Sequence, residues 1–421
     1  MDLKSIIKEQ RLELENIQKT ERIILRDGLI EAEAQLKHPN VLVVTGIRRC
    51  GKSIFSYLLE KSHKFGYINF DDERLFDFKA SELDKVLQAF YELYGEINYL
   101  ILDEIQNISG WELFVNRLRR SKRVILTGSN SNLLSSELAT HITGRHVDVK
   151  LFPFSFKEYL DFKGFTFSNA YTTQEKAAIL NHLENYLING GMPELYKFGK
   201  AILLRTYEDI LTKDVIIRRK IKKSDELKKM AKYLISNSAE EVSYSNLAKN
   251  LGIKHVSTVS KWVSYLEECF LLFRLEKFDF KLKQQSLASK KIYCIDSGII
   301  DLIGFKFSEN KGKILENTVA VQLQRKKEKD NEMEVYYWKD YSQKEVDFVI
   351  KKRQKIIELM QVTAISSKEE LKNREINALL AASEKLKCNN LTIITLDCEA
   401  AEKISNKTIK LIPVWKWLME E

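Results

Sequence analysis

The residue types at positions 46–53 are those that bind the phosphates of a nucleotide. Two glycines let the backbone turn its N–H groups inward, a lysine follows the second glycine, and a serine closes the segment. The lysine ammonium attracts the β- and γ-phosphates, and the serine hydroxyl is a ligand for Mg²⁺. The sequence therefore predicts a phosphate-binding loop of the Walker A pattern, formed by Gly46, Ile47, Arg48, Arg49, Cys50, Gly51, Lys52 and Ser53. The two arginines could face phosphate or a subunit interface.

Two adjacent carboxylates follow a short apolar run at 99–102. Such a run is typical of a strand buried on both faces, which places Asp103 and Glu104 at its end. Asp103 is expected to hold Mg²⁺ directly or through water, and Glu104 to act as the general base that polarises the attacking water. An acidic pair after a strand is also a common loop start, but its position downstream of a Walker A pattern favours the catalytic interpretation.

The elements that must position these residues can be identified in the same stretch. Residues 41–45 form a β-branched apolar run that predicts a strand, and residues 54–59 have helical spacing. Strand, glycine loop and helix is the order that the Walker A pattern requires, because the phosphates then lie at the positive end of the helix. A further apolar run begins at residue 123 and ends in the small polar residues Ser129 and Asn130.

Composition limits the class of protein. A chain of 421 residues is too long for one compact core and predicts two or three domains, and 44% hydrophobic with 30% charged residues indicates a globular protein. No apolar run reaches the roughly 20 residues of a membrane helix, and no signal core follows the N-terminus, so a cytoplasmic protein without membrane contact is expected. The five scattered cysteines lack zinc-site spacing, and the net charge of +9 mildly favours acidic partners such as nucleic acid.

Six short motifs occur together, at 46–53, 102–106, 127–129, 144–145, 151–159 and 190–194. This combination resembles a family of prokaryotic AAA-type ATPases of the AAA+ superfamily. Its members join an ATPase to a winged-helix segment and a C-terminal domain of unknown function related to PD-(D/E)XK nucleases. The resemblance covers nearly the whole chain. It implies an α/β fold: a P-loop NTPase parallel sheet with a helical lid, a winged helix and a restriction-endonuclease-like α/β domain.

The resemblance also implies roles for residues outside the loop. The strand beginning at 123 should lie between the other two and end in a γ-phosphate sensor, for which Ser129 or Asn130 is the candidate; the alternative is a helix cap, which both residue types favour. Arg145 is a candidate arginine finger for a neighbouring subunit, or else a surface or packing arginine. A homo-oligomeric ring is the corresponding assembly.

Pattern and resemblance together divide the chain into a P-loop ATPase domain at 1–165, a helical lid at 166–235, a winged-helix segment at 236–285 and a nuclease-like domain at 286–421. Within the third segment, two short helices separated by a four-residue turn have helix-turn-helix spacing. Polar and basic residues at the start of the second helix suit contact with DNA, whereas winged helices in ATPases also serve as protein-contact lids. These residues are Lys254, His255, Ser257, Thr258, Ser260 and Lys261.

The last segment carries an incomplete nuclease site. A PD-(D/E)XK nuclease needs a helix glutamate, a strand aspartate and Glu-x-Lys on the next strand, which hold Mg²⁺ and activate water. Glu316 and Asp347 stand where the first two belong, but the third element begins with Gln361 and has Thr363 in the lysine position. Because neither supplies the missing charge, the site is predicted to be degenerate, and nucleic-acid binding without cleavage is favoured.

The expected function is that of an ATP- and Mg²⁺-dependent ATPase that moves its winged-helix and nuclease-like segments and acts on DNA. Two alternatives stay open. An ATP-gated, metal-dependent nuclease would cut nucleic acid and lose this activity in Asp347→Ala. A nucleotide-controlled assembly switch would turn over little ATP and change its oligomer size with nucleotide.

Overall fold

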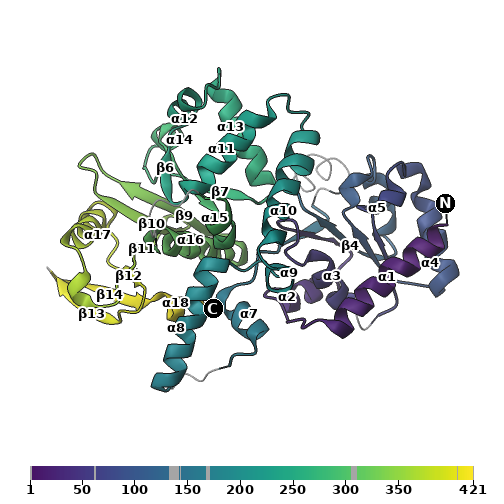
Figure 1. Cartoon of the computed structure of the whole chain (residues 1–421), viewed down its shortest axis with the longest axis horizontal. Helices are drawn as coiled ribbons and strands as arrows, with labels where there is room; N and C mark the ends of the chain where they lie inside the picture. The colour runs from purple at the N-terminus through teal and green to yellow at the C-terminus, as the bar shows by residue number, and fades with distance from the viewer. Residues whose placement is uncertain are drawn as a thin grey trace. The chain divides into compact units, whose positions relative to one another are not determined.

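The computed structural model of the chain describes residues 2–60, 63–131, 142, 144–166, 171–304, 311–404 and 406–420. It divides into two compact units (Figure 1). The first comprises residues 1–152, 161–164 and 268–270, and the second comprises residues 153–160, 165–267 and 271–421. Among the residues described, no helix is both long and apolar enough to cross a membrane.

The first unit is built on a parallel sheet of five strands in the order β2-β3-β4-β1-β5. As the resemblance implied, β4 lies between β3 and β1. The strands are β1 (Val41–Thr45), β2 (Phe65–Asn69), β3 (Tyr99–Asp103), β4 (Arg123–Gly128) and β5 (His146–Lys150).

Helices cover both faces of this sheet, which explains why its strands are apolar throughout. Alternate residues such as Val41, Val43 and Leu100 join a core with side chains of α1 (Leu3–Thr20), α4 (Leu83–Tyr94) and α5 (Glu112–Leu118). In Figure 1, α1 and α4 lie side by side. On the other face, α3 (Lys52–Glu60) packs on β1, β3 and β4, and α2 (Leu29–Gln35) packs on α3. Because all strands are parallel, their carboxyl ends meet at one edge.

The second unit contains a small antiparallel sheet of three strands in the order β6-β8-β7. The two helices expected in this segment are present as α12 and α13. The predicted boundary after residue 285 puts residues 290–294 in the nuclease-like domain, whereas these residues form β8, which pairs with β6 and β7 through backbone hydrogen bonds. The elements are α11 (Ser224–Ser236), β6 (Glu240–Val242), α12 (Tyr244–Asn250), α13 (Val256–Glu268), β7 (Leu272–Leu275), α14 (Leu282–Leu287) and β8 (Lys290–Cys294).

Helices precede this sheet and follow it in the second unit. Before it come α7 (Phe156–Lys163), α8 (Thr173–Asn189), α9 (Leu195–Phe198), and α10 (Ala201–Asp209), which continues as a π-helix over Ile210–Ile217. After it, α15 (Ser297–Ile303) packs on α8 and α10.

The C-terminal part of the second unit is a six-stranded mixed sheet in the order β13-β14-β12-β11-β10-β9. Helix α17 packs on β10 and β11 through an apolar core, and α16 packs on β9 and β11. From α16 to β12 the order is helix, three strands, helix and strand, and residues 368–370 form a 3-10 turn before α17. The elements are α16 (Lys311–Lys329), β9 (Met333–Lys339), β10 (Glu345–Lys352), β11 (Lys355–Thr363), α17 (Asn373–Leu386), β12 (Leu391–Thr395), β13 (Ala400–Ile404), β14 (Lys407–Pro413) and α18 (Val414–Met419).

Candidate functional site

The loop at 46–53 leaves β1 and ends in the first turn of α3. Gly46 and Gly51 have φ angles of 153° and 98°, a conformation that other residues rarely adopt. A Cβ atom at Gly46 would also collide with the carbonyl oxygen of Leu151, so only glycine fits there. Cys50 is buried and its thiol lies 3.5 Å from the same carbonyl, which makes it a packing residue of the loop.

Lys52 directs its ammonium back into the loop. Its Nζ donates to the carbonyl oxygens of Gly46 and Ile47, both at 3.2 Å, and lies 3.7 Å from Glu104 Oε1. The side chain is only 4% exposed. Its nearest partners are therefore neutral carbonyls, which an ammonium can exchange for phosphate oxygens with a net gain in electrostatic attraction.

Asp103 lies at the end of β3 and is held by hydroxyl groups. It accepts hydrogen bonds from Tyr67 Oη at 2.8 Å, from Thr127 Oγ1 and from Ser53. Burial and the nearby charge of Glu104 raise the pKa of this carboxyl, and the hydrogen bonds oppose that rise. The two residues predicted to hold Mg²⁺ are thus brought together, and a hydroxyl beside a carboxylate is an all-oxygen donor set that suits this ion.

Glu104 is positioned by the residues that end β4. Its backbone has the left-handed conformation (φ 51°), and its N–H donates to Thr127 Oγ1 at 3.1 Å. Its carboxylate accepts from the N–H and the hydroxyl of Ser129, at 3.4 and 3.3 Å, and from Gln106 Nε2. The predicted base and the predicted sensor are therefore in direct contact.

The charges around Glu104 keep it ionised. Burial raises the pKa of its carboxyl, but the positive charges of Lys52 and Arg48 and the hydrogen bonds from Gln106 and Ser129 together outweigh burial, and the pKa lies below its ordinary value. Arg48 also forms an ion pair with Asp71, with Nη1 3.1 Å from Oδ2. At neutral pH the site therefore contains a carboxylate that can accept a proton.

Two other predicted residues do not join this cluster. Asn130 is buried, and its Nδ2 lies 3.8 Å from Cys269 Sγ, so Ser129 is the sensor candidate that reaches the acidic pair. Arg145 is exposed and precedes β5, where its carbonyl accepts from the N–H of Val41 at the start of β1. It lies at the opposite edge of the sheet from the loop and is absent from the site of its own chain. Its role toward a neighbouring subunit stays a prediction.

Sequence reasoning missed three residues that support the site. Arg26 is buried and spans two carbonyl oxygens, of Cys50 at 2.9 Å and of Phe152 at 2.7 Å, which ties the end of the loop to the segment that follows β5. Tyr67 and Thr127 orient Asp103. Thr127 belongs to a motif that was recognised, whereas Arg26 and Tyr67 carry no sequence signal.

A second cluster of charged side chains lies in the second unit. Glu316 on α16 and Asp347 on β10, the predicted nuclease-like carboxylates, meet around a lysine that sequence reasoning missed. The ammonium of Lys291 lies 2.9 Å from Glu316 Oε1, 3.1 Å from Asp347 Oδ1 and 2.6 Å from Glu345 Oε1. Gln361 lies beside them, with its Oε1 3.4 Å from the N–H of Asp347. The sequence signal that could have revealed Lys291 is its position, as a charged residue, in an otherwise largely apolar strand.

The ionisation of this cluster reflects its burial. Burial lowers the pKa of Lys291, but the surrounding carboxylates raise it well above the ordinary value, so the lysine is charged. Burial and the charge of Asp347 raise the pKa of Glu316 to about 7. Within the described part of the chain, no group of three or more His, Cys, Asp or Glu side chains is arranged to hold a metal ion.

The motif at 190–194 packs against Asp296. The N–H of Gly191 donates to Asp296 Oδ2 at 2.7 Å, and a Cβ atom at Gly191 would collide with the carbonyl oxygen of Phe154. The N–H of Phe154 donates to the carbonyl of Gly191 at 2.6 Å. This motif therefore has a packing role that requires glycine.

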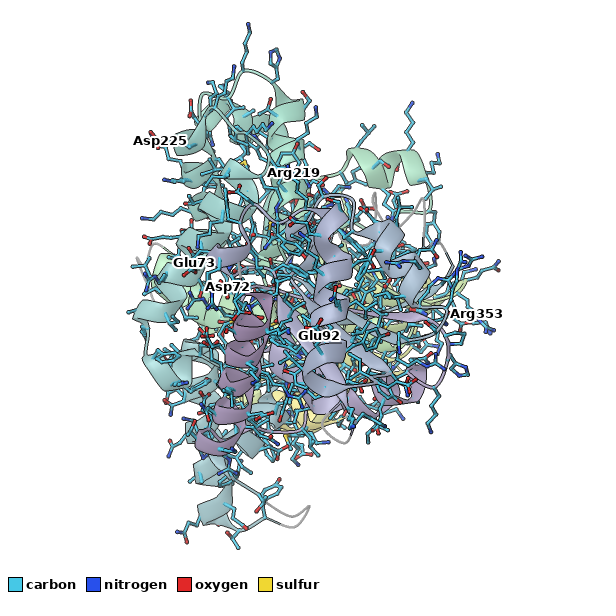
Figure 2. The ribbon with its side chains drawn as sticks, turned by 90° about the vertical axis from the view of Figure 1, so that its right-hand side faces the viewer. Asp72, Glu73, Glu92, Arg219, Asp225 and Arg353 are labelled. Atoms are coloured by element: carbon cyan, nitrogen blue, oxygen red, sulfur yellow. The ribbon has the colours of Figure 1, made fainter. Side chains whose placement is uncertain are left out.

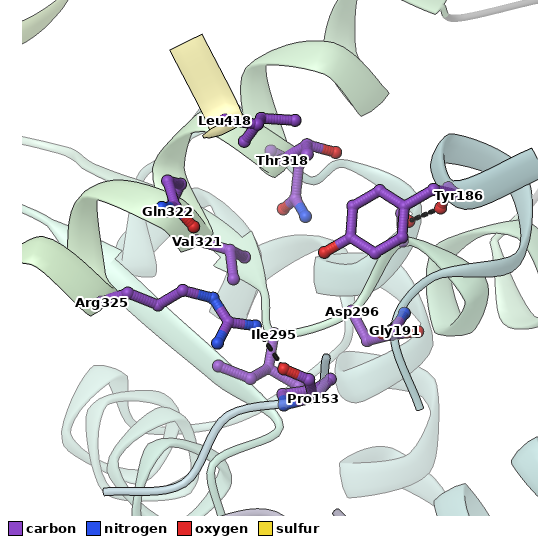
Figure 3. Close-up of a pocket in the computed structure, with 12 residues that line it drawn as sticks. Pro153, Tyr186, Gly191, Ile295, Asp296, Thr318, Val321, Gln322, Arg325 and Leu418 are labelled. Carbon is purple, nitrogen blue, oxygen red and sulfur yellow. Dashed lines mark hydrogen bonds between the residues drawn. The ribbon is translucent and has the colours of Figure 1, made fainter. Parts of the chain in front are cut away.

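The cavity beside Asp296 is too small for a cofactor. Figure 3 shows Tyr186, Asp296 and Arg325 around it, with the Arg325 guanidinium donating to the carbonyl oxygen of Pro153. Its volume is about 20 Å³, enough for about one water molecule. It does not compete with the loop as a ligand site.

Comparison with family models divides the chain into three matched segments. Residues 38–160 match the AAA domain, residues 180–308 match a domain of unknown function (DUF8612), and residues 311–417 match another domain of unknown function (DUF4143). The first match contains the loop, the acidic pair and Ser129.

Whole-chain relatives have also been found. An uncharacterized protein of Methanocaldococcus jannaschii is 35% identical over 436 residues, which cover 99% of this chain and 96% of the relative. An uncharacterized protein of Haemophilus influenzae is 28% identical over 362 residues, covering 80% of this chain and 86% of the relative.

Solved structures give weaker likenesses. The Walker-type ATPase PABY2304 of Pyrococcus abyssi has a TM-score of 0.47 at 17% identity and covers 68% of this chain and 97% of its own. AMPPCP-bound DnaA from Aquifex aeolicus has a TM-score of 0.26 at 18% identity, covering 61% and 91%. At these scores neither likeness bears on what the chain does.

Proposed function

The chain belongs to the family of AAA-domain proteins that includes the M. jannaschii relative, and from that premise we propose that it is a Mg²⁺-dependent ATPase. One observation carries the proposal. The glycine loop with Lys52, the Ser53–Asp103 pair and the ionised Glu104 lie together at the carboxyl edge of one parallel sheet. In open α/β sheets this edge is where ligands bind.

The residues of the site divide the work of hydrolysis. Lys52 exchanges its two carbonyl partners for oxygens of the β- and γ-phosphates, and Ser53 and Asp103 hold Mg²⁺. Bound Mg²⁺ neutralises charge on the phosphate oxygens. Glu104 orients the attacking water and accepts its proton, while the hydroxyl of Ser129 steadies the Glu104 carboxylate and reports the γ-phosphate.

ATP hydrolysis and nucleotide binding by purified protein test this assignment. We expect Mg²⁺-dependent turnover that falls about 100-fold in Glu104→Gln, with nucleotide binding retained, because only proton transfer is removed. Lys52→Ala should lose nucleotide binding, and Lys64→Ala, which changes an exposed lysine before β2, should behave as wild type. The proposal fails if wild type binds no ATP or if Lys52→Ala changes nothing. Slow turnover with a nucleotide-dependent oligomer size would favour the assembly switch instead.

A second observation favours DNA as a partner. The order α11, β6, α12, α13, β7, α14, β8 with an antiparallel β6-β8-β7 sheet supports the expected winged helix, with α14 inserted between its last two strands. A basic stretch at 218–223 lies against the exposed side of α13 and forms a groove of about 270 Å³ with it. Arg219, labelled in Figure 2, stacks its guanidinium on the ring of Tyr265 at 4.7 Å. The groove residues include Arg219, Lys222, Lys223, Thr258, Lys261 and Tyr265.

This groove gathers several cations along one surface, which suits contacts to the phosphates of a duplex. Lys222→Glu combined with Lys261→Glu should lower the affinity for a DNA duplex at least tenfold and reduce its dependence on salt. Lys228→Glu with Lys232→Glu, which reverses two exposed lysines of α11 away from the groove, is the matched control. Equal affinities of both variants, measured by fluorescence anisotropy, would remove the groove as a DNA contact.

A further inference from the structure

The carboxylate cluster of the C-terminal domain converges on an ammonium group. Glu316 comes from α16, and Glu345 and Asp347 come from the same face of β10, because they are two residues apart. One oxygen of each lies within 3.1 Å of Lys291 Nζ. An ammonium has three N–H groups, as many as there are carboxylates around it. No position among these three oxygens is left for a second cation.

Lys291 is held in this position by its strand. Its side chain is 2% exposed, and β8 pairs with Glu241 on one side and Leu275 on the other. Tyr293, two residues along the same face, donates to Glu316 Oε1 at 2.8 Å. The backbone that carries the lysine is therefore held by strands on both sides, and its ammonium lies in a buried position.

The other partners of these carboxylates are also protein groups. Glu345 is shared with a second lysine, Lys339, whose Nζ lies 3.4 Å from Oε2. Gln361 is neutral, and Asp347 Oδ2 accepts the N–H of Val362 at 3.0 Å. The outer oxygens of Glu345 and Asp347 are therefore already occupied by protein groups.

We propose that the ammonium of Lys291 takes the place of a divalent cation, so that the C-terminal domain holds a closed ion cluster and cuts no nucleic acid. The residues present do not fit a catalytic metal. A lysine that served a metal centre would face water or phosphate beside the ion, whereas Lys291 contacts all three carboxylates itself.

Mn²⁺ binding by nucleotide-free protein, measured by electron paramagnetic resonance, tests the proposal. Wild type should show no site that depends on Asp347. Lys291→Ala should gain one site at least tenfold tighter than any in wild type, and Asp347→Asn in that background should abolish it. Lys290→Ala, the neighbouring lysine whose Nζ donates to the carbonyl of Gln285, should gain nothing. An Asp347-dependent site in wild type, or a folded Lys291→Ala without the new site, would overturn the proposal.

A second measurement decides the matter even if Lys291→Ala does not fold. In a metal centre without its ion, Glu316→Gln relieves repulsion between carboxylates and raises the melting temperature. In a cluster filled by lysine, the same change removes an ion pair and lowers the melting temperature, which is our expectation. Mg²⁺- or Mn²⁺-dependent cutting by wild type that is lost in Asp347→Ala would also refute the proposal. None of these tests involves the loop at 46–53, so their failure leaves the ATPase proposal standing.

Discussion

The two units each bury a lysine, and the partners of the two ammonium groups are opposite in kind. Lys52 lies against two neutral carbonyls at 3.2 Å and one carboxylate at 3.7 Å. Lys291 lies within 3.1 Å of three carboxylates. Lys52 has one carboxylate at 3.7 Å and two closer neutral carbonyls that phosphate oxygens can replace, whereas Lys291 is surrounded by carboxylates alone. The same side chain can therefore form a binding site or close one, depending on its neighbours.

The backbone around each lysine reinforces the difference. Lys52 opens α3, so the positive end of the helix adds to its charge. Lys291 lies in a strand paired on both sides, where only its side chain is directed toward the cluster.

Replacing each lysine by methionine gives the largest expected difference in stability between the two sites. Lys291→Met removes the shared cation from the buried Asp347 and the partly buried Glu316 and Glu345, and should lower the free energy of unfolding by about 3–5 kcal/mol. Lys52→Met removes hydrogen bonds to two carbonyls and an ion pair at 3.7 Å to one carboxylate, and should cost less, about 1–2 kcal/mol. Urea unfolding followed by tryptophan fluorescence measures both. Equal losses would mean that the two lysines do not differ as described.

An intermediate effect is expected at Arg26, which supports the first site from behind. Arg26→Ala removes a buried guanidinium from the carbonyls of Cys50 and Phe152, and should cost about 1–3 kcal/mol and weaken nucleotide binding. Arg22→Ala, which removes an exposed contact to the carbonyl of Asp161, is the control and should change neither quantity. Unchanged nucleotide affinity in Arg26→Ala would show that the loop keeps its shape without this support.

The smallest effect concerns a buried carboxylate that no lysine neutralises. Glu60 ends α3 and is fully buried, and burial followed by the charge of Glu33 raises the pKa of its carboxyl to about 8. Its carboxyl oxygens have no hydrogen-bond partner among the described residues, although His63 Nδ1 lies 3.4 Å from one of them. The folded state therefore holds this proton after the unfolded chain has lost it, and stability falls as pH rises from about 4.5 to about 8.

Glu60→Gln should remove part of the loss of stability that occurs as pH rises. We expect it to stabilise the protein by about 1–2 kcal/mol at pH 8 and hardly at pH 4, where both states are protonated. Thermal unfolding at the two pH values measures the difference, with Glu31→Gln on exposed α2 surface as control. A gain that is the same at both pH values would contradict the assigned pKa.

The sequence by itself determined the features that are contiguous in the chain. The loop at 46–53 and the acidic pair at 103–104 each occupy one segment, and their residue types at fixed spacing leave few other interpretations. The apolar runs around them predicted the parallel sheet, because strands covered on both faces carry an apolar signal along their whole length.

Only the tertiary structure decided which residues from distant parts of the chain contact these segments. Arg26 comes to the first site from the segment before α2, and Tyr67 comes from β2. Lys291 comes to the carboxylate cluster from β8, which pairs with strands outside the C-terminal sheet. The position of Arg145 was decided by strand register. The strand that it precedes, β5, begins beside the start of β1, whereas the loop lies at the end of β1, so Arg145 lies away from the loop. Strand pairing brings distant segments together through backbone hydrogen bonds that every residue type can make, and residue types alone therefore do not reveal it.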